Sequence, residues 1–143
     1  LDTIKENYKD NREDFKYEYI SGLSNLASYI LKSKSFEDNT SYFEEYFILF
    51  KIEDICHSGE LYHFMEPFIN YYQIVSHLQD TKEKKELLQS LEQLADKSKE
   101  NYKQRYPDDY EEQIVWKDMA YSPAEMFKDN LLYEKYEIFI KIF

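Results

Sequence analysis

Apolar residues recur at helical rather than strand spacing along most of this chain. Between Ile4 and Leu31 they follow an i, i+3, i+4, i+7 pattern, which predicts one long amphipathic helix with a possible bend at Gly22. A polar break over residues 34–40 (KSFEDNT) ends that pattern. The stretch 42–56 is then apolar around most of its circumference, which predicts a helix at the centre of the domain.

Glycine, proline and capping residues divide the rest of the chain into further helices. Ser41 and Glu44 match a capping box at a helix start, and Gly59 is placed to end that helix. Pro67 is expected to kink or restart the following helix, and Pro107 suits the first turn of a later one. Further helices are expected over 41–58, 60–79, 80–102 and 107–119, and from the start signal SPAE at 122–125.

The last eight residues, YEIFIKIF, alternate β-branched and aromatic side chains and also fit a short strand. No partner strand is recognisable, so the end of the last helix is the preferred interpretation. With only 2 Gly and 3 Pro, the chain has too few turn residues for a many-stranded β protein. We therefore predict an all-α fold: a single domain over residues 1–143, with five to six antiparallel helices joined by short loops and a short C-terminal strand as the alternative.

Composition restricts the function classes. The formal net charge of −11 argues against binding to nucleic-acid phosphates and favours a basic protein partner. No apolar run approaches the ~18 residues needed to span a bilayer, and no signal peptide is recognisable in a chain that begins at Leu1 rather than Met. The single cysteine excludes an internal disulfide and fits a reducing compartment, so a cytoplasmic location is expected.

The stretch EDICHSGELYHF, residues 53–64, is the one place that resembles a chemical site. Its two acid–histidine pairs lie on either side of Gly59 within ten residues, so they cannot face each other across a bundle core as a di-iron site requires. Cys56 and His57 would point about 100° apart on a helix and cannot pair directly. We therefore predict no catalytic residue, no metal ligand and no cofactor. The alternative is a helical bundle that binds a metal or an apolar ligand near Cys56, His57, His63 and His77.

Acidic and aromatic residues are concentrated in YPDDYEEQIVW, residues 106–116, and again in FEDNTSYFEEY, residues 36–46. One interpretation is an ordinary helix start, whose acids complement the helix dipole while residues 114–116 face the core. The other is a recognition surface, because Tyr and Trp are favoured at binding hot spots and carboxylates match a cationic partner. Residues 82–105 carry a net charge of +2, so the acid excess of −13 lies elsewhere. The residues expected to bind a partner are Glu44, Glu45, Glu53, Asp54, Asp108, Asp109, Tyr110, Glu111, Glu112 and Trp116.

In size, acidity, aromatic content, helical pattern and Lys/Ile/Tyr/Asn-rich usage, the chain resembles the small acidic α-helical immunity proteins that bacteria make against their own polymorphic or contact-dependent toxins. No family motif is matched, so the resemblance assigns no residues. It implies a non-enzymatic inhibitor that covers the active-site cleft of a cognate, basic, nuclease-like toxin. The alternatives are a phage-encoded nucleic-acid mimic directed at a host defence protein, and a regulatory helical module that binds another protein. The aromatic excess also fits a homodimer surface.

Overall fold

The computed structural model describes residues 1–36, 40–55, 57–121 and 129–143, without the side chains of residues 13, 14 and 53. Every regular element in this part of the chain is helical, so the all-α prediction is confirmed and the strand alternative for the C-terminus is wrong. The elements are α1 (Asp2–Asp10), α2 (Arg12–Ser33), α3 (Ser41–Leu49), the 3-10 turn η1 (Ile52–Asp54), α4 (Tyr62–Ser76), α5 (Lys82–Arg105), α6 (Tyr110–Ala120) and α8 (Asn130–Ile142).

The described residues contain seven α-helices rather than the five to six predicted, because the expected first helix is divided in two. The division lies at Asn11, whose backbone is extended with φ −147° and ψ 91°. The Tyr8 and Tyr19 rings then meet edge to face with centroids 5.1 Å apart. In one straight helix these residues would be separated by about 16 Å along the axis. The chain therefore folds back, and α1 packs on α2.

Gly22 does not bend α2, which runs through it without a break. A Cβ atom at this position would lie 2.8 Å from Cδ2 of Leu1, at the start of the chain. The glycine therefore allows the N-terminal residue to approach the helix closely. The helical pattern alone does not reveal this contact. Leu1 and Gly22 belong to two segments that the pattern assigns to the same helix.

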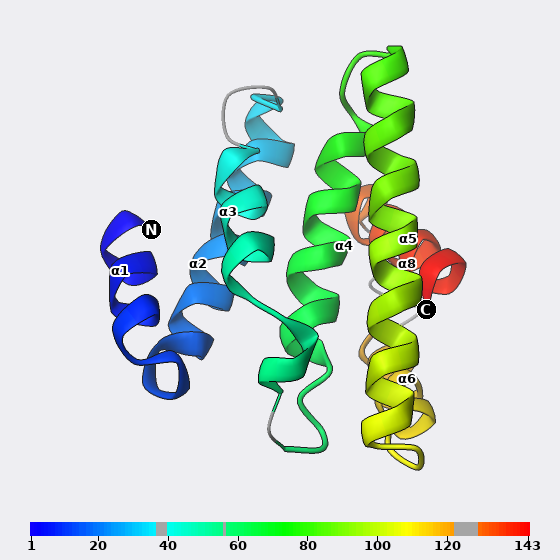
Figure 1. Cartoon of the computed structure of the whole chain (residues 1–143). Coiled ribbons are helices and arrows are strands. Elements are labelled where there is room, and N and C mark those ends of the chain that lie inside the picture. The colour runs from blue at the N-terminus through cyan, green and yellow to red at the C-terminus, as the bar shows by residue number, and fades with distance from the viewer. Residues whose placement is uncertain (37–39, 56, 122–128) are drawn as a thin grey trace.

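The central helix is α4 rather than the predicted 42–56 segment. Between His63 and Val75, eleven residues of α4 expose 5% or less of their surface. Glu66 is half-buried. Figure 1 shows α2, α3, α4 and α5 alternating in direction, with α4 between α3 and α5. By contrast α3 ends early, at Leu49, and leaves Ile48 exposed. The 12-residue connection to α4 is longer than the predicted short loop.

Pro67 lies inside α4 and neither ends nor restarts the helix. A proline has no amide hydrogen, so the carbonyl of His63, four residues earlier, loses its helical donor. The hydroxyl of Tyr46 donates to this carbonyl oxygen at 2.6 Å within the core. Burial raises the pKa of the Tyr46 phenol well above its usual value, which keeps the hydroxyl protonated as a donor. A side chain from α3 thus replaces the missing backbone hydrogen bond.

Two helix N-caps lie one residue away from the predicted positions: Thr81 rather than residue 80 for α5, and Thr40 rather than Ser41 for α3. The side chain that caps α5 belongs to Thr81, whose hydroxyl accepts from the Lys84 amide at 3.2 Å, while Asp80 accepts from the Lys84 ammonium instead. Ser41 is already helical, and no side-chain cap hydrogen bond is formed at the start of α3. Likewise α6 begins three residues after Pro107, which lies in the preceding turn. The predicted start at 122–125 lies outside the described residues.

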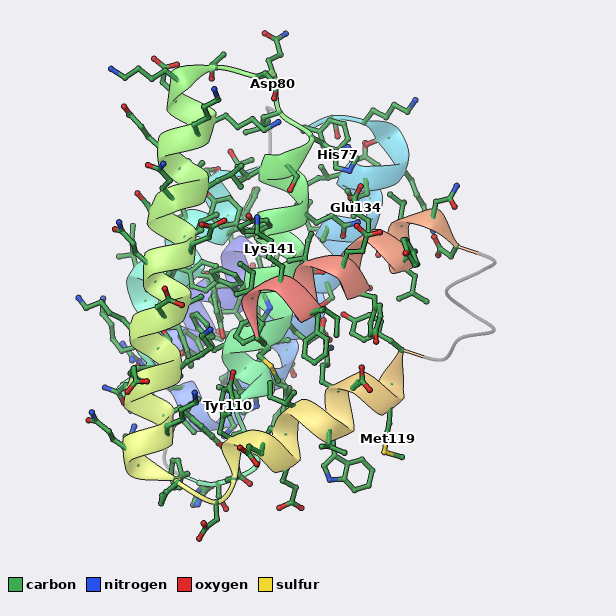
Figure 2. All side chains as sticks on the ribbon, turned by 90° about the vertical axis from the view of Figure 1, so that its right-hand side faces the viewer. His77, Asp80, Tyr110, Met119, Glu134 and Lys141 are labelled. Atoms are coloured by element: carbon green, nitrogen blue, oxygen red, sulfur yellow. The ribbon has the colours of Figure 1, made fainter. Side chains whose placement is uncertain are left out.

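The C-terminal helix α8 crosses the long helices at a steep angle, as α6 does (Figure 2). The antiparallel arrangement predicted for all helices therefore does not extend to these two. The end of α8 is fixed by donors from other helices: the Lys99 ammonium donates to the Ile142 carbonyl at 2.6 Å and the Tyr110 hydroxyl to that of Phe143 at 3.1 Å. A cation at this end also complements the helix dipole. None of the described helices combines the length and the apolar character needed to cross a membrane.

Candidate partner-binding surface

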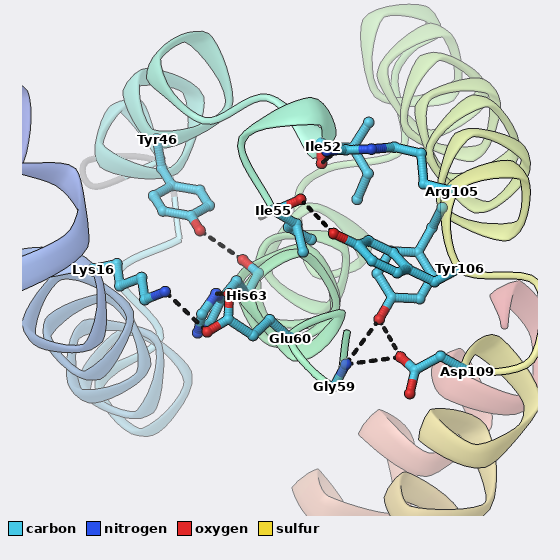
Figure 3. Close-up of polar contacts among 11 residues, drawn as sticks. Lys16, Tyr46, Ile52, Ile55, Gly59, Glu60, His63, Arg105, Tyr106 and Asp109 are labelled. Carbon is cyan, nitrogen blue, oxygen red and sulfur yellow. Dashed lines mark hydrogen bonds and ion pairs between the residues drawn. The ribbon is translucent and has the colours of Figure 1, made fainter. Parts of the chain in front are cut away.

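The sequence stretch 53–64 belongs mainly to the connection between α3 and α4, and polar groups from α5 and from the turn between α5 and α6 hold it in place (Figure 3). The Gly59 amide donates to the Asp109 carboxylate at 2.8 Å and to the Tyr102 hydroxyl at 3.2 Å. The Tyr106 hydroxyl donates to the carbonyl of Ile55, and the Arg105 guanidinium to that of Ile52, both at 3.2 Å. Gly59 does make a turn, with φ +86°, but in this connection rather than at a helix end.

The described histidines do not converge on one site. His57 is exposed in the connection, while His63 is buried at the start of α4 between the rings of Tyr17 and Tyr62. His77 lies 14 residues further along, about 21 Å away along the helix, where its ring stacks on Phe36 and its Nε2 atom lies 2.6 Å from the Glu134 carboxylate. Cys56 is outside the described residues. Within the described part of the chain, no three His, Cys, Asp or Glu side chains are grouped as metal ligands.

Two of the predicted partner-binding residues hold the protein together. Asp109 accepts hydrogen bonds from Gly59 and from the hydroxyl of Tyr102. Tyr110 is 7% exposed, its hydroxyl bonds to the last residue of the chain, and its ring lies 4.5 Å from the Lys103 ammonium. Burial raises the pKa of the Tyr110 phenol to about 12. Both side chains are therefore committed to contacts within the fold.

The predicted residues near α3 also have partners, and these come from three different helices. Glu44 accepts from the Tyr71 hydroxyl of α4 at 3.1 Å. Glu45 pairs with Lys5 of α1 at 2.8 Å, and Asp54 pairs with Arg12 of α2. The side chain of Glu53 lies outside the described part of the structure. Glu45 and Asp54 are therefore paired with cations, and Glu44 accepts a hydrogen bond from a neutral hydroxyl. In Figure 1, α3 and α6 are well separated.

The remaining predicted residues lie on the outward side of α6 and in the turn before it. Asp108, Glu111 and Glu112 are exposed, and no other described side chain forms an ion pair with them. Trp116 is 62% exposed, and its neighbours Val115 and Met119 are 57% and 68% exposed. The helical residues of this set follow one face at positions i, i+1, i+4, i+5 and i+8. We call Asp108, Glu111, Glu112, Val115, Trp116 and Met119 the α6 surface.

The α6 surface has an acidic end and an apolar end. Figure 2 shows the Met119 side chain directed away from the body of the protein, whereas Tyr110 at the other end of α6 is directed inward. Glu112 and Met119 are two helical turns apart, about 10 Å along the axis. A shallow hollow of about 340 Å³ adjoins the acidic end, with Asp108, Asp109 and Glu112 among its lining residues. Carboxylates around a hollow can receive the cationic end of a Lys or Arg side chain, although Arg105 of the protein itself lines the same hollow.

The inward side of α6 is unusual because it contains a buried cation. Lys117 contacts the Glu66 carboxylate of α4, and its ammonium lies 5.3 Å from the centre of the Tyr121 ring. Burial, and to a smaller extent the nearby Lys135 ammonium, lowers the pKa of Lys117 to about 8. The contact with the Glu66 carboxylate acts in the opposite direction, because it favours the charged ammonium. Burial also lowers the pKa of Lys135. Polar contacts as well as apolar packing therefore fix the orientation of α6.

Sequence reasoning missed Val115 and Met119, and the ordinary-helix interpretation assigned Val115 and Trp116 to the core. The helical spacing contained the signal. Tyr110, Ile114, Lys117 and Tyr121 recur at i, i+4, i+7 and i+11, and all four are half-buried or buried in the structure. Trp116 falls 100° away from Lys117 on the same helix, on the outward side.

No protein-family model, curated protein or solved structure matches this chain. The α6 surface is therefore the basis for a functional proposal, through its exposure, its charge and its shape.

Proposed function

We propose that this protein is a non-enzymatic inhibitor that binds a basic protein through the α6 surface. In the most specific form of the proposal it is an immunity protein that occludes the active-site cleft of a nuclease-like toxin. The observation that carries the proposal is the exposure of Trp116, Val115 and Met119 beside three carboxylates without an ion-pair partner among the described residues. Neighbouring exposed apolar side chains, a tryptophan among them, beside charged residues are a common feature of protein-binding sites.

The mechanism needs no reaction at the α6 surface. A nuclease binds phosphates with Lys and Arg side chains, and the carboxylates of Asp108, Glu111 and Glu112 can take the place of those phosphates. Trp116 can fill a pocket that stacks a base, because an indole presents a similar flat apolar face. The net charge of −11 would speed the encounter with a basic protein at low salt.

The test is to co-express the chain with the basic product of the neighbouring open reading frame. We expect that product to stop growth and degrade nucleic acid when expressed alone, and to lose both effects when the chain is present. The chain with Asp108→Lys, Glu111→Lys and Glu112→Lys should protect less well. If the neighbouring product is harmless, or if it remains harmful in the presence of the wild-type chain, the immunity proposal is wrong.

A matched control separates the site from total charge. Glu83, Glu86 and Glu100 are exposed on α5, and their reversal to Lys changes the net charge by the same amount. We expect this α5 variant to protect as well as the wild type. Equal loss of protection in both variants would mean that net charge, and not the α6 surface, is responsible.

A further inference from the structure

A second site lies away from α6, in a pocket of about 290 Å³ between α3, α4 and α5. Its lining residues come from the end of α3 and the extended segment after it, from the start of α4, and from one face of α5. They are Phe47, Phe50, Lys51, Ile52, Phe64, Leu94, Lys97, Ser98 and Asn101. The four α5 residues follow i, i+3, i+4 and i+7 spacing, so a single stripe of that helix forms one wall.

The pocket combines an apolar interior with a cationic rim. Phe50 and Phe64 are 7% and 2% exposed, which makes them fixed parts of the core rather than mobile surface side chains. Lys51 and Lys97 are both exposed and come from the two sides of the pocket. Neither forms an ion pair with any side chain that the structure describes. Two exposed lysines around one pocket, without an ion-pair partner among the described side chains, stand out in a chain whose net charge is −11.

The volume of the pocket fits a small ligand. Small-molecule pockets usually begin at about 300 Å³, so this one is at the lower limit and is too small for a helix of another protein. Aromatic and aliphatic walls favour an apolar body, and two ammonium groups at the rim favour an anionic end. The buried hydroxyl of Ser98 adds a hydrogen-bonding group beside the lysines.

We propose that this pocket binds a small organic carboxylate with an aromatic or aliphatic body. The body would lie against Phe50, Phe64 and Leu94, and the carboxylate would lie between the ammonium groups of Lys51 and Lys97. This site is independent of the α6 surface, so neither proposal depends on the other.

The test uses 3-phenylpropionate as the probe and the neutral 3-phenylpropanamide as its matched analogue. We expect 1:1 binding of the acid to the full chain with a Kd of about 1 mM or lower, and binding of the amide about tenfold weaker. In NMR titrations, the shifted backbone amides should lie within residues 47–52 and 94–101. No saturable shift up to about 10 mM acid, or equal affinity for acid and amide, would overturn the proposal.

Lys97→Gln tests the cationic rim without disturbing packing, because Lys97 is exposed. It should weaken binding of the acid about threefold to tenfold and leave binding of the amide unchanged. Lys85→Gln, an exposed position on the same helix outside the pocket, is the matched control and should change neither. If Lys97→Gln and Lys85→Gln have the same effect, the lysines do not bind the carboxylate and the assignment fails.

Discussion

Much of this chain's high aromatic content consists of tyrosines whose hydroxyls form hydrogen bonds within the protein. A sequence with 15 Tyr suggests a surface rich in binding residues, yet many of these side chains donate hydrogen bonds inside the fold. Their acceptors are backbone carbonyls or carboxylates that lie outside the helix of the tyrosine itself. The tyrosines with such bonds are Tyr46, Tyr71, Tyr72, Tyr102, Tyr106, Tyr110 and Tyr136. At the residue scale, aromatic content is therefore mainly a property of the core.

Tyr46 offers the sharpest residue-scale prediction. Tyr46→Phe should lower the free energy of unfolding by about 1–3 kcal/mol, because the His63 carbonyl is left without a donor in the core. In a Pro67→Ala background the loss should be smaller, since the restored amide hydrogen can donate to the same carbonyl. Urea denaturation of the wild type, the two single variants and the double variant measures the coupling free energy between Tyr46 and Pro67. Tyr29→Phe, at an exposed tyrosine, is the control and should cost less than about 0.5 kcal/mol. Equal losses with and without Pro67 would contradict the proposed replacement.

Lys117 makes the stability depend on pH above neutrality. Its pKa is about 8 in the folded protein and near 10.5 when unfolded, so between these values the unfolded chain binds more protons. The free energy of unfolding should therefore rise with pH from about 8 until the tyrosines begin to ionise. Lys117→Met should reduce this rise, and Lys82→Met, at an exposed position, should not. Denaturant titrations between pH 7 and 9.5 test this; an unchanged slope in Lys117→Met would refute the assignment.

At the scale of elements, helical periodicity predicted the positions of most helices but not how they contact each other. The break at Asn11 and the close approach of Leu1 to Gly22 arise because α1 packs back on α2, a contact that local pattern does not encode. The kink or restart predicted at Pro67 is wrong, since the Tyr46 hydroxyl replaces the hydrogen bond that the proline removes. For the candidate site, the acidic and aromatic composition singled out residues 106–116, of which Trp116 and three carboxylates are exposed in the structure. It could not separate the exposed Asp108 from Asp109, whose carboxylate is hydrogen-bonded, since this difference depends on the loop at Gly59.

These two neighbouring carboxylates give an element-scale prediction. Asp109→Ala should destabilise the protein by about 1–3 kcal/mol and speed amide hydrogen exchange within residues 51–60, because the connection loses its anchor at Gly59. Asp108→Ala, one residue away and exposed, should change stability by less than about 0.5 kcal/mol. Thermal or urea unfolding with hydrogen exchange distinguishes the two. Similar effects from both substitutions would show that Asp109 is not the anchor.

At the scale of the whole molecule, exposed acids and exposed apolar side chains occur on several helices, and α6 carries both within three helical turns. The chain has an excess of acid, yet many carboxylates elsewhere pair with lysines, arginines or hydroxyls, as on α3. The α6 surface combines three exposed carboxylates, which have no ion-pair partner among the described residues, with three exposed apolar side chains. A partner that fits it must present cations beside an apolar pocket.

Trp116 should contribute most of the affinity at the apolar end. Trp116→Ala should weaken partner binding by about 2 kcal/mol or more, roughly thirtyfold, since exposed tryptophans at interfaces are frequent hot spots. Stability should be unchanged within about 0.5 kcal/mol, because the side chain is 62% exposed. Tyr29→Ala, equally exposed on α2, is the matched control and should leave affinity unchanged. Calorimetry measures both variants; an unaffected complex of Trp116→Ala would remove this residue from the interface.

The most direct measurement is the Kd of the purified complex with the basic partner, determined at several salt concentrations. Compared with the wild type, Asp108→Lys/Glu111→Lys/Glu112→Lys should raise the Kd at least about a hundredfold at low salt and flatten its salt dependence. The α5 reversal of Glu83, Glu86 and Glu100 should retain the salt dependence and most of the affinity. If the α6 and α5 reversals weaken binding equally, or if the α6 reversal has no effect, the α6 surface is not the binding site.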